Sequence, residues 1–434
     1  MPSPGRLLPS LVFALLLAAC EEKAKPPFPA RRPDAGERTI EPFPLGAKPS
    51  ASQAPAAPPS ASAGDAAPPA AHGSADAGPA GDGGALAGCR RTFGPAEMPF
   101  RGPAVMRVEG EELVLILNDA GTPKLHAVPI PPVPPRTAAT PPAPPPPSAF
   151  FAVSWPACAL AGKYTYCPGP GGRVFRSGPQ GRKEVAKGRP ATRITAAPLG
   201  DGHSIVAYLD ERTTTEGKVL QAFAAFDEEP PVRLSDDGAG ATSVTLAPRG
   251  AGALAFYLDA RTSMVPIHAR PIRLAGGKLE LQKDVVVAVG GPPERGVAGA
   301  VAVTASGAAF GLVPMAEDTL SFGMGVVKVG DPPREDTPIL WSRYPNGLDP
   351  APVVATAGAA PTRVLRVRTA AKEPTAPRAL ELGRLDDQGA FTTDGLVEIG
   401  KPFLDLGLLV DPKGSVWILY GDASVAFLER RTCG

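Results

Sequence analysis

The chain has 434 residues, of which 56 are Pro and 49 are Gly, and both types are unevenly distributed, so the folded part is shorter than the chain. The 44 Lys and Arg residues against 43 Asp and Glu give a net charge of +1, which leaves no basic excess to neutralise phosphates. A nucleic-acid partner is therefore not expected.

The first 19 residues have the features of a signal peptide. Arg6 supplies a positive charge near the N-terminus, and an apolar run follows from Leu11 to Ala19. This run is shorter than the roughly 20 residues that a helix needs to cross a bilayer. The sequence therefore predicts a signal peptide over residues 1–19 rather than a membrane-spanning helix.

The end of this segment, Leu17-Ala18-Ala19-Cys20, resembles the lipobox of bacterial lipoproteins. The resemblance implies that the Cys20 thiol receives a diacylglycerol and that Cys20 becomes the lipidated N-terminus, with two or more acyl chains as a stable membrane anchor. In that family an Asp after the cysteine retains the protein in the inner membrane. Glu21 follows here, so the resemblance implies the outer membrane, with the domain facing the periplasm or the cell surface. An ordinary secretory signal with an accidental cysteine is the alternative.

Residues 20–88 read as a tether. Pro, Ala and Gly make up most of this stretch, and its only aromatic residues are Phe28 and Phe43. Such a composition does not build a core, so we predict a disordered linker that holds the following domain away from the membrane.

The domain from 89 to 434 is predicted to be all-β, because short runs of Val, Leu, Ile and Phe alternate with Gly, Pro and Asp. One internal repeat is plain: Ala191–Thr213 aligns with Ala241–Thr262, which places Asp210 and Asp259 49 residues apart. Weaker copies of the same strand, turn and strand pattern end at Asp119, Val313, Arg368 and Asp422, and a short copy with cysteine lies around Tyr164.

A period of about 40 to 50 residues with several strands each is typical of propeller blades. The domain gives about 49 residues per blade for seven blades, about 57 for six and about 43 for eight. We predict a seven-bladed β-propeller, with six or eight blades as alternatives; the regular interval disfavours a pair of β-sandwiches. The segments Tyr208-Leu209-Asp210-x-Arg212 and Tyr257-Leu258-Asp259-x-Arg261 resemble the Asp-x-Arg propeller repeats of exported bacterial proteins, over two blades.

Two segments have an unusual composition. The run from Val297 to Met315 is uncharged, but its Gly, Pro, Ser and Thr residues oppose a spanning helix and its position fits a blade, so we predict two buried strands. Residues 129–147 are mostly Pro. Because Pro donates no hydrogen bond to a sheet, we predict an exposed Pro-rich loop insertion there.

Four cysteines remain after Cys20, and they permit three pairings. Cys89 and Cys433 stand at the two ends of the domain, which a circular fold brings together, whereas Cys158 and Cys167 are nine residues apart. We therefore predict that Cys89–Cys433 locks the ring and that Cys158–Cys167 staples a loop or hairpin. Metal binding is the alternative, and we assign no metal site because no Cys-x-x-Cys or histidine spacing supports one.

The repeated Asp210–Arg212 and Asp259–Arg261 pairs are the candidate site residues. Residues two apart in a strand face the same side, so each pair is expected to form an ion pair within its blade. The alternative is an anion clamp, in which Arg212 and Arg261 share one face.

No nucleophile elbow, phosphate loop, zinc helix motif or calcium loop occurs, so we assign neither catalytic residues nor a cofactor. We predict a lipid-anchored, monomeric, non-enzymatic propeller that binds or scaffolds an envelope protein or polysaccharide. The alternative is a propeller hydrolase or lyase acting on a glycan, which would require two or more carboxylates near the central channel beside an Arg or Tyr.

Overall fold

The computed structural model describes residues 88–134, 151–152, 155–189, 193–214, 217–227, 229–236, 240–259, 265–290, 299–316, 322–335, 337–343, 352–357, 360–369, 377–400, 403–421 and 424–433. The predicted signal peptide, Cys20 and the predicted tether as far as residue 87 lie outside these residues. So does most of the predicted Pro-rich loop at 129–147, of which residues 129–134 are described.

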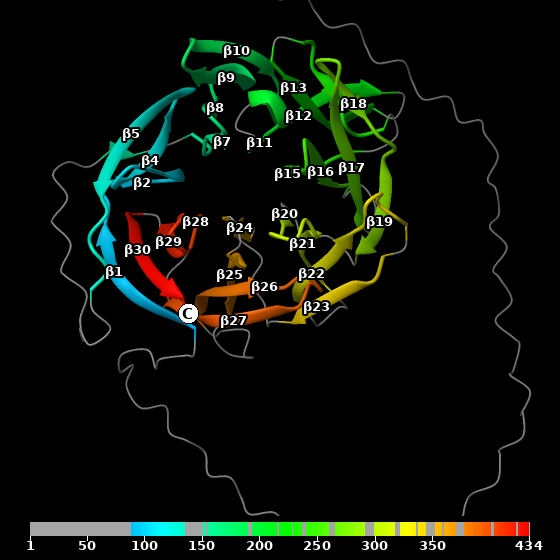
Figure 1. Cartoon of the computed structure of the whole chain (residues 1–434). Helices are drawn as coiled ribbons and strands as arrows, with labels where there is room; N and C mark the ends of the chain where they lie inside the picture. The colour runs from blue at the N-terminus through cyan, green and yellow to red at the C-terminus, as the bar shows by residue number, and fades with distance from the viewer. Residues whose placement is uncertain are drawn as a thin grey trace, which may run out of the picture. The chain divides into compact units, whose positions relative to one another are not determined.

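Seven antiparallel sheets surround a central channel, so the fold is a seven-bladed β-propeller, as predicted (Figure 1). In chain order, the first blade contains β3 (Ala104–Glu109), β4 (Glu112–Asp119) and β5 (Thr122–Pro129), and the second contains β7 (Ala159–Ala161), β8 (Tyr164–Pro168), β9 (Arg173–Gly178) and β10 (Gly181–Lys187). The third blade contains β11 (Thr195–Pro198), β12 (Ser204–Thr214), β13 (Gly217–Phe226) and β14 (Val232–Arg233), and the fourth contains β15 (Ser243–Arg249), β16 (Gly252–Leu258), β17 (Val265–Ala275), β18 (Lys278–Leu281) and β19 (Val285–Gly290). The fifth blade contains β20 (Ala300–Val303), β21 (Ala309–Ala316), β22 (Phe322–Val329) and β23 (Ile339–Arg343), and the sixth contains β24 (Val353–Ala355), β25 (Thr362–Thr369), β26 (Arg378–Leu385) and β27 (Phe391–Ile399).

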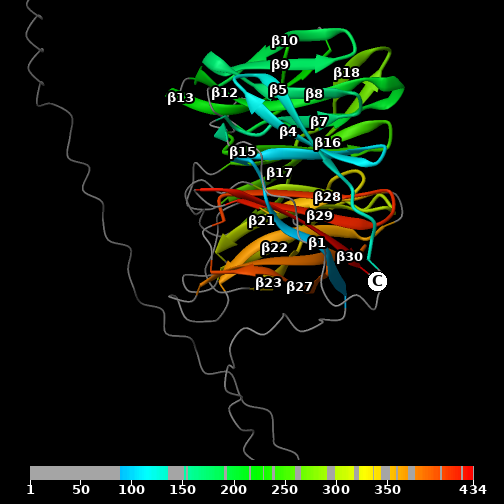
Figure 2. The same ribbon diagram turned by 90° about the vertical axis from the view of Figure 1, so that its left-hand side faces the viewer.

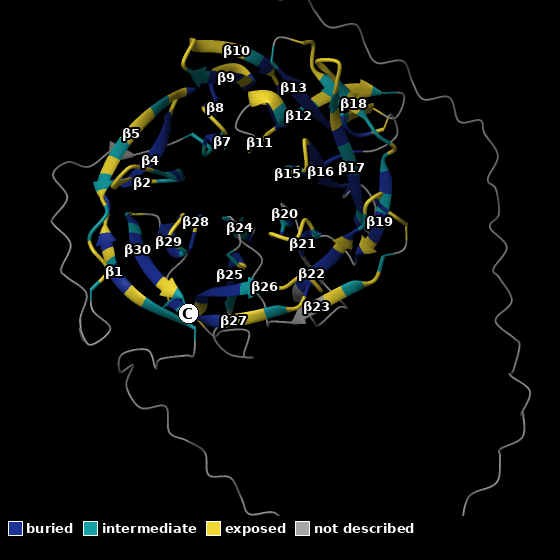
Figure 3. Cartoon of the chain, viewed as in Figure 1, coloured by how far each residue is buried: buried dark blue, intermediate teal, exposed yellow. Residues whose placement is uncertain are grey.

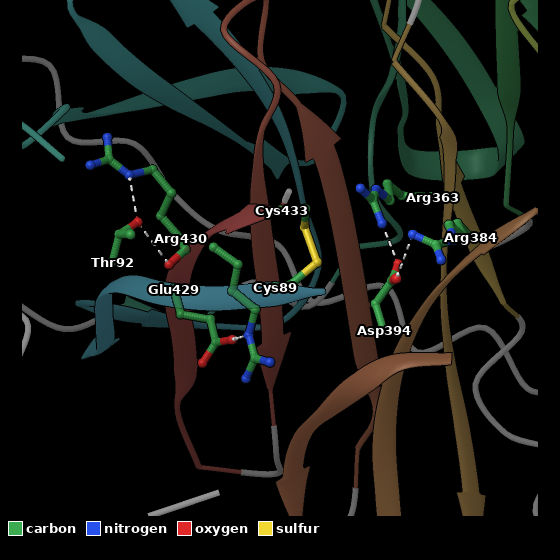
Figure 4. Close-up of a disulfide and its surroundings, with 9 residues drawn as sticks. Cys89, Thr92, Arg363, Arg384, Asp394, Glu429, Arg430 and Cys433 are labelled. Carbon is green, nitrogen blue, oxygen red and sulfur yellow. Dashed lines mark hydrogen bonds and ion pairs between the residues drawn. A yellow bond between two sulfur atoms is a disulfide. The ribbon is translucent and has the colours of Figure 1, made fainter. Parts of the chain in front are cut away.

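The seventh blade combines the two ends of the domain. Its strands are β28 (Asp405–Val410), β29 (Ser415–Gly421), β30 (Ala426–Cys433) and, on the outer edge, β1 (Cys89–Glu97). Cys89 is opposite Cys433 in the β1–β30 register, and the two cysteines form a disulfide (Figure 4). The predicted closure of the ring is confirmed. Outside the blades, β2 (Phe100–Arg101) and β6 (Phe151–Ala152) form a short parallel pair.

Each copy of the sequence repeat contributes the inner strand and the second strand of a blade. The second strands lie inside the propeller with a neighbouring blade on both faces, so both of their faces are buried (Figure 3) and carry apolar side chains. All seven residues of β16 and all seven of β29 are buried. The sequence therefore shows continuous apolar runs at a regular interval, one for each second strand.

The run from Val297 to Met315 contains β20 and most of β21, as the two-strand prediction requires. Across the part of the chain that the structure describes, no helix is long and apolar enough to cross a membrane. Gly311 of β21 shows how tightly neighbouring blades pack: a Cβ atom there would lie 2.0 Å from the ring of Phe256 in the fourth blade. Only Gly fits at that position.

The strand directions define two faces of the propeller. We call the face at which the inner strands begin the mouth face, and the opposite face the closure face. Because strands alternate in direction, β30, the third strand of its blade, ends on the closure face and β1 begins there. The edge-on view of Figure 2 shows the C-terminal end on one face of the ring. The chain thus enters the propeller at Cys89 on the closure face.

Candidate functional site

The central channel opens at the mouth face into a cavity of about 1040 Å³. All seven inner strands, β3, β7, β11, β15, β20, β24 and β28, contribute residues to its wall. Most of the wall is aliphatic, with Val, Leu, Ile, Ala and Pro side chains from every blade. A large apolar cavity with a few polar groups is the usual form of a ligand-binding site.

The wall also contains backbone polar groups. Each inner strand pairs with its neighbour along one edge only, so its other edge faces the cavity. Hydroxyl groups occupy part of these edges: the Leu246 amide donates to Thr195 Oγ1 (3.0 Å), and Thr245 Oγ1 donates to the Gly299 carbonyl (3.1 Å). Thr195 and Thr245 occupy equivalent positions of the repeat, and each links its inner strand to that of the next blade.

Among the described residues, three charged side chains line the cavity: Arg193, which precedes β11, Arg378 at the start of β26, and Asp405 at the start of β28. Burial raises the pKa of the Asp405 carboxyl, and the charge of Arg193 acts in the opposite direction. Among the described residues, Arg193 and Asp405 form no ion pair or hydrogen bond with each other or with another side chain. The sequence offered no motif that could have identified these three residues.

A disulfide and an asparagine fix one sector of the wall. Cys158 lines the cavity and is bonded to Cys167, which confirms the second predicted pairing. The Asn118 amide donates to the carbonyls of Pro156 and Pro168, at 2.8 Å each, and so holds both ends of this disulfide loop against the first blade. The cysteine spacing indicated the staple, but Asn118 was not expected.

The two repeated Asp-x-Arg segments differ in their surroundings. Arg212 Nη2 lies 2.7 Å from Asp210 Oδ2, and the Arg212 side chain, half exposed, lies over the Phe223 ring. Asp259 is buried, and its Oδ2 accepts a hydrogen bond from the Gly240 amide at 3.1 Å. Arg261 lies outside the described residues, so the choice between ion pairs and an anion clamp stays a prediction.

The remaining groups with acid-base chemistry lie elsewhere. His203 Nδ1 is 2.5 Å from Asp227 Oδ2, and His268 Nδ1 is 3.0 Å from Asp284 Oδ2. None of these four residues belongs to the cavity wall. Within the described ranges, no group of three or more His, Cys, Asp or Glu side chains is arranged to hold a metal ion. Asp405 is the single carboxylate that the described part of the wall presents.

Comparisons with known proteins give fold likeness only. No protein-family model matches the chain, and no curated protein matches it significantly. Among solved structures, YjhT matches with a TM-score of 0.37 and 11% identity over 63% of this chain and 92% of that chain. The soluble aldose sugar dehydrogenase of Escherichia coli gives 0.34 and 12% over 63% and 95%. The GH32 β-fructofuranosidase BmSUC1 of Bombyx mori gives 0.32 and 9% over 60% and 66%. At these values the matches bear on neither the site nor its chemistry.

Proposed function

We propose that the chain is a lipid-anchored binding or scaffold module of the bacterial outer membrane, without enzymatic activity, that takes a protein segment or an envelope polymer at the mouth of its channel. The observation that carries this proposal is the cavity itself. Its wall is large and aliphatic, and Arg193, Arg378 and Asp405 are its charged groups among the described residues. Such a wall holds a ligand by shape and a few charges.

The place where the chain enters the propeller supports the same role. The predicted lipid is attached at Cys20, and the tether joins the propeller at Cys89 on the closure face. The mouth lies on the other face, so the point at which the predicted tether joins the propeller is not at the rim of the cavity.

A glycan hydrolase or lyase is the less favoured reading. Glycoside hydrolysis by the common mechanisms needs two carboxyl groups about 5 to 10 Å apart, one on each side of the scissile bond. The described wall supplies Asp405 alone.

Site-specific photo-crosslinking in the producing bacterium tests the proposal. A photoreactive amino acid replaces Leu404, which is 51% exposed at the mouth, and the matched control carries it at Lys413, an exposed residue on the closure face of the same blade. We expect a discrete adduct from position 404 that is missing from position 413. Equal labelling at both positions, or none at either, would contradict binding at the mouth.

The enzymatic alternative has a separate test. Envelope glycans are incubated with the purified full chain and with Asp405→Asn, and new reducing ends or unsaturated products are measured. We expect no product from either protein. Product formation by the parent chain that Asp405→Asn abolishes would replace the binding proposal with the enzymatic one.

A further inference from the structure

Arg193 and Asp405 face the same cavity with opposite charges, and neither has a side-chain partner in the described structure. Arg193 belongs to the third blade and Asp405 to the seventh, which are three positions apart in the ring of seven. They therefore stand on nearly opposite sides of the mouth. The charge of Arg193 nevertheless acts on the Asp405 carboxyl.

Asp405 is partly buried, and a partly buried charge without a partner is unfavourable. A ligand that places a cation beside Asp405 and an anion beside Arg193 removes this penalty on one side and gains a charge-assisted hydrogen bond on the other. A ligand with only one of these charges pairs with one of the two groups and leaves the other without a partner. The pair of charges thus favours a ligand that carries both signs.

The rest of the wall indicates the body of such a ligand. The free edges of the inner strands present backbone groups that bind other backbone groups well, as in peptide recognition by sheet edges. Small aliphatic side chains such as Ala159, Val244 and Val353 line the same cavity and fit aliphatic side chains of a ligand. A volume of about 1040 Å³ is at the upper end of the range for small-molecule sites and leaves room for a short peptide.

We propose that the mouth binds a short peptide with small aliphatic side chains, a free ammonium group directed to Asp405 and a free carboxylate directed to Arg193. This inference rests on the proposed function, since it names the ligand class of the same cavity. The wall aliphatics hold the peptide side chains, and the two charges set its direction across the mouth.

Peptide binding to the full mature chain in detergent, measured by isothermal titration calorimetry, tests the inference. The probes are Ala-Val-Leu-Ala with both ends free, the same peptide acetylated at the N-terminus, the same peptide amidated at the C-terminus, and the doubly blocked form. We expect the free peptide to bind most tightly, with a loss of about tenfold for each blocked end, as for removal of one charge-assisted hydrogen bond.

The variants assign each end to its residue. In Asp405→Asn, acetylation of the peptide should no longer weaken binding, whereas amidation still should. In Arg193→Gln the pattern should reverse. Lys413→Gln, on the closure face, is the control and should retain the full preference for free ends. If blocked and free peptides bind equally, if none binds at millimolar concentration, or if both variants keep both preferences, the inference is wrong.

Two further arms separate this inference from the proposed function. Glycerophosphoethanolamine carries the same two charge signs on a lipid headgroup; if it binds and competes at the mouth while the peptides do not, the peptide class is refuted. An adduct from position 404 together with a failure of every peptide probe would keep binding at the mouth and overturn the ligand class. Failure of the adduct itself would overturn the proposed function.

Discussion

The ion pairs of this propeller differ greatly in burial, and their removal should differ accordingly. Arg366 of β25 places its Nε 2.7 Å from Glu381 Oε2 of β26, with side chains that are 5% and 4% exposed. Arg212, in contrast, is 52% exposed beside Asp210. An exposed pair contributes about 0 to 1 kcal/mol because water and salt screen it, whereas removing one partner of a buried pair costs about 3 to 5 kcal/mol.

Arg366→Ala leaves the Glu381 carboxylate buried, although Arg368 (3.2 Å) and the Thr393 hydroxyl (2.9 Å) still contact it. We therefore expect a loss near the lower end of the range, about 3 kcal/mol in the free energy of unfolding. Arg212→Ala also loses a contact with the Phe223 ring, yet its total should stay within about 1 kcal/mol.

Urea unfolding followed by tryptophan fluorescence, to which the buried Trp417 contributes, and by far-ultraviolet circular dichroism measures both losses. The double variant Arg366→Met and Glu381→Leu is the control: it removes both charges, so it should recover much of the stability that Arg366→Ala loses. A loss from Arg366→Ala no greater than that from Arg212→Ala, or a double variant no more stable than the single one, would refute the reasoning.

Three other expectations concern the lipid, the ring closure and a buried carboxylate. Cys20→Ala should abolish acyl labelling and leave the chain unprocessed or soluble; membrane partitioning after signal cleavage would contradict the lipid assignment. Replacing Cys89 and Cys433 by Ala should lower the unfolding free energy by up to about 5.8 kcal/mol for their 344-residue separation, against about 2.6 kcal/mol for the 9-residue disulfide, in urea titrations of the oxidised proteins. Burial raises the pKa of the Glu429 carboxyl above its ordinary 4.5. Between pH 4.5 and this raised pKa the folded state holds a proton that the unfolded state releases, so the free energy of unfolding should fall as the pH rises through this interval. Glu429→Gln should flatten this part of the plot of stability against pH.

The architecture was predictable because the signal lies in strands that both neighbouring blades cover. β16 and β29 each carry apolar side chains on both faces, and their copies recur about once per blade. The disulfide pairing was predictable for a related reason. A ring brings its first and last residues together, so Cys89 and Cys433 were the natural pair once the blades had been counted.

The mouth was not predictable, because its charged residues are single positions without a motif. Arg193 and Asp405 are 212 residues apart in the sequence, and only the ring places them around one cavity. The two copies of the repeat share some of their contacts and differ in others. Thr195 and Thr245 each bond to the backbone of the next blade, Thr195 as acceptor and Thr245 as donor, whereas Asp259 binds the backbone of Gly240 and Asp210 faces Arg212 near solvent. Repetition preserved the links from one inner strand to the next blade and did not preserve the contacts of the repeated Asp.

The way the ring closes also determines where a tether has to join it. An inner strand begins on the mouth face, so a chain that entered the propeller through its first inner strand, β3, would bring its tether to the rim of the cavity. Here β1 precedes that strand and pairs with β30 in the opposite direction, which moves the entry point to the closure face. The disulfide at Cys89 then fixes the entry point at the first residue of β1. One added strand therefore closes the ring and places the N-terminal end of the propeller on the face opposite the mouth.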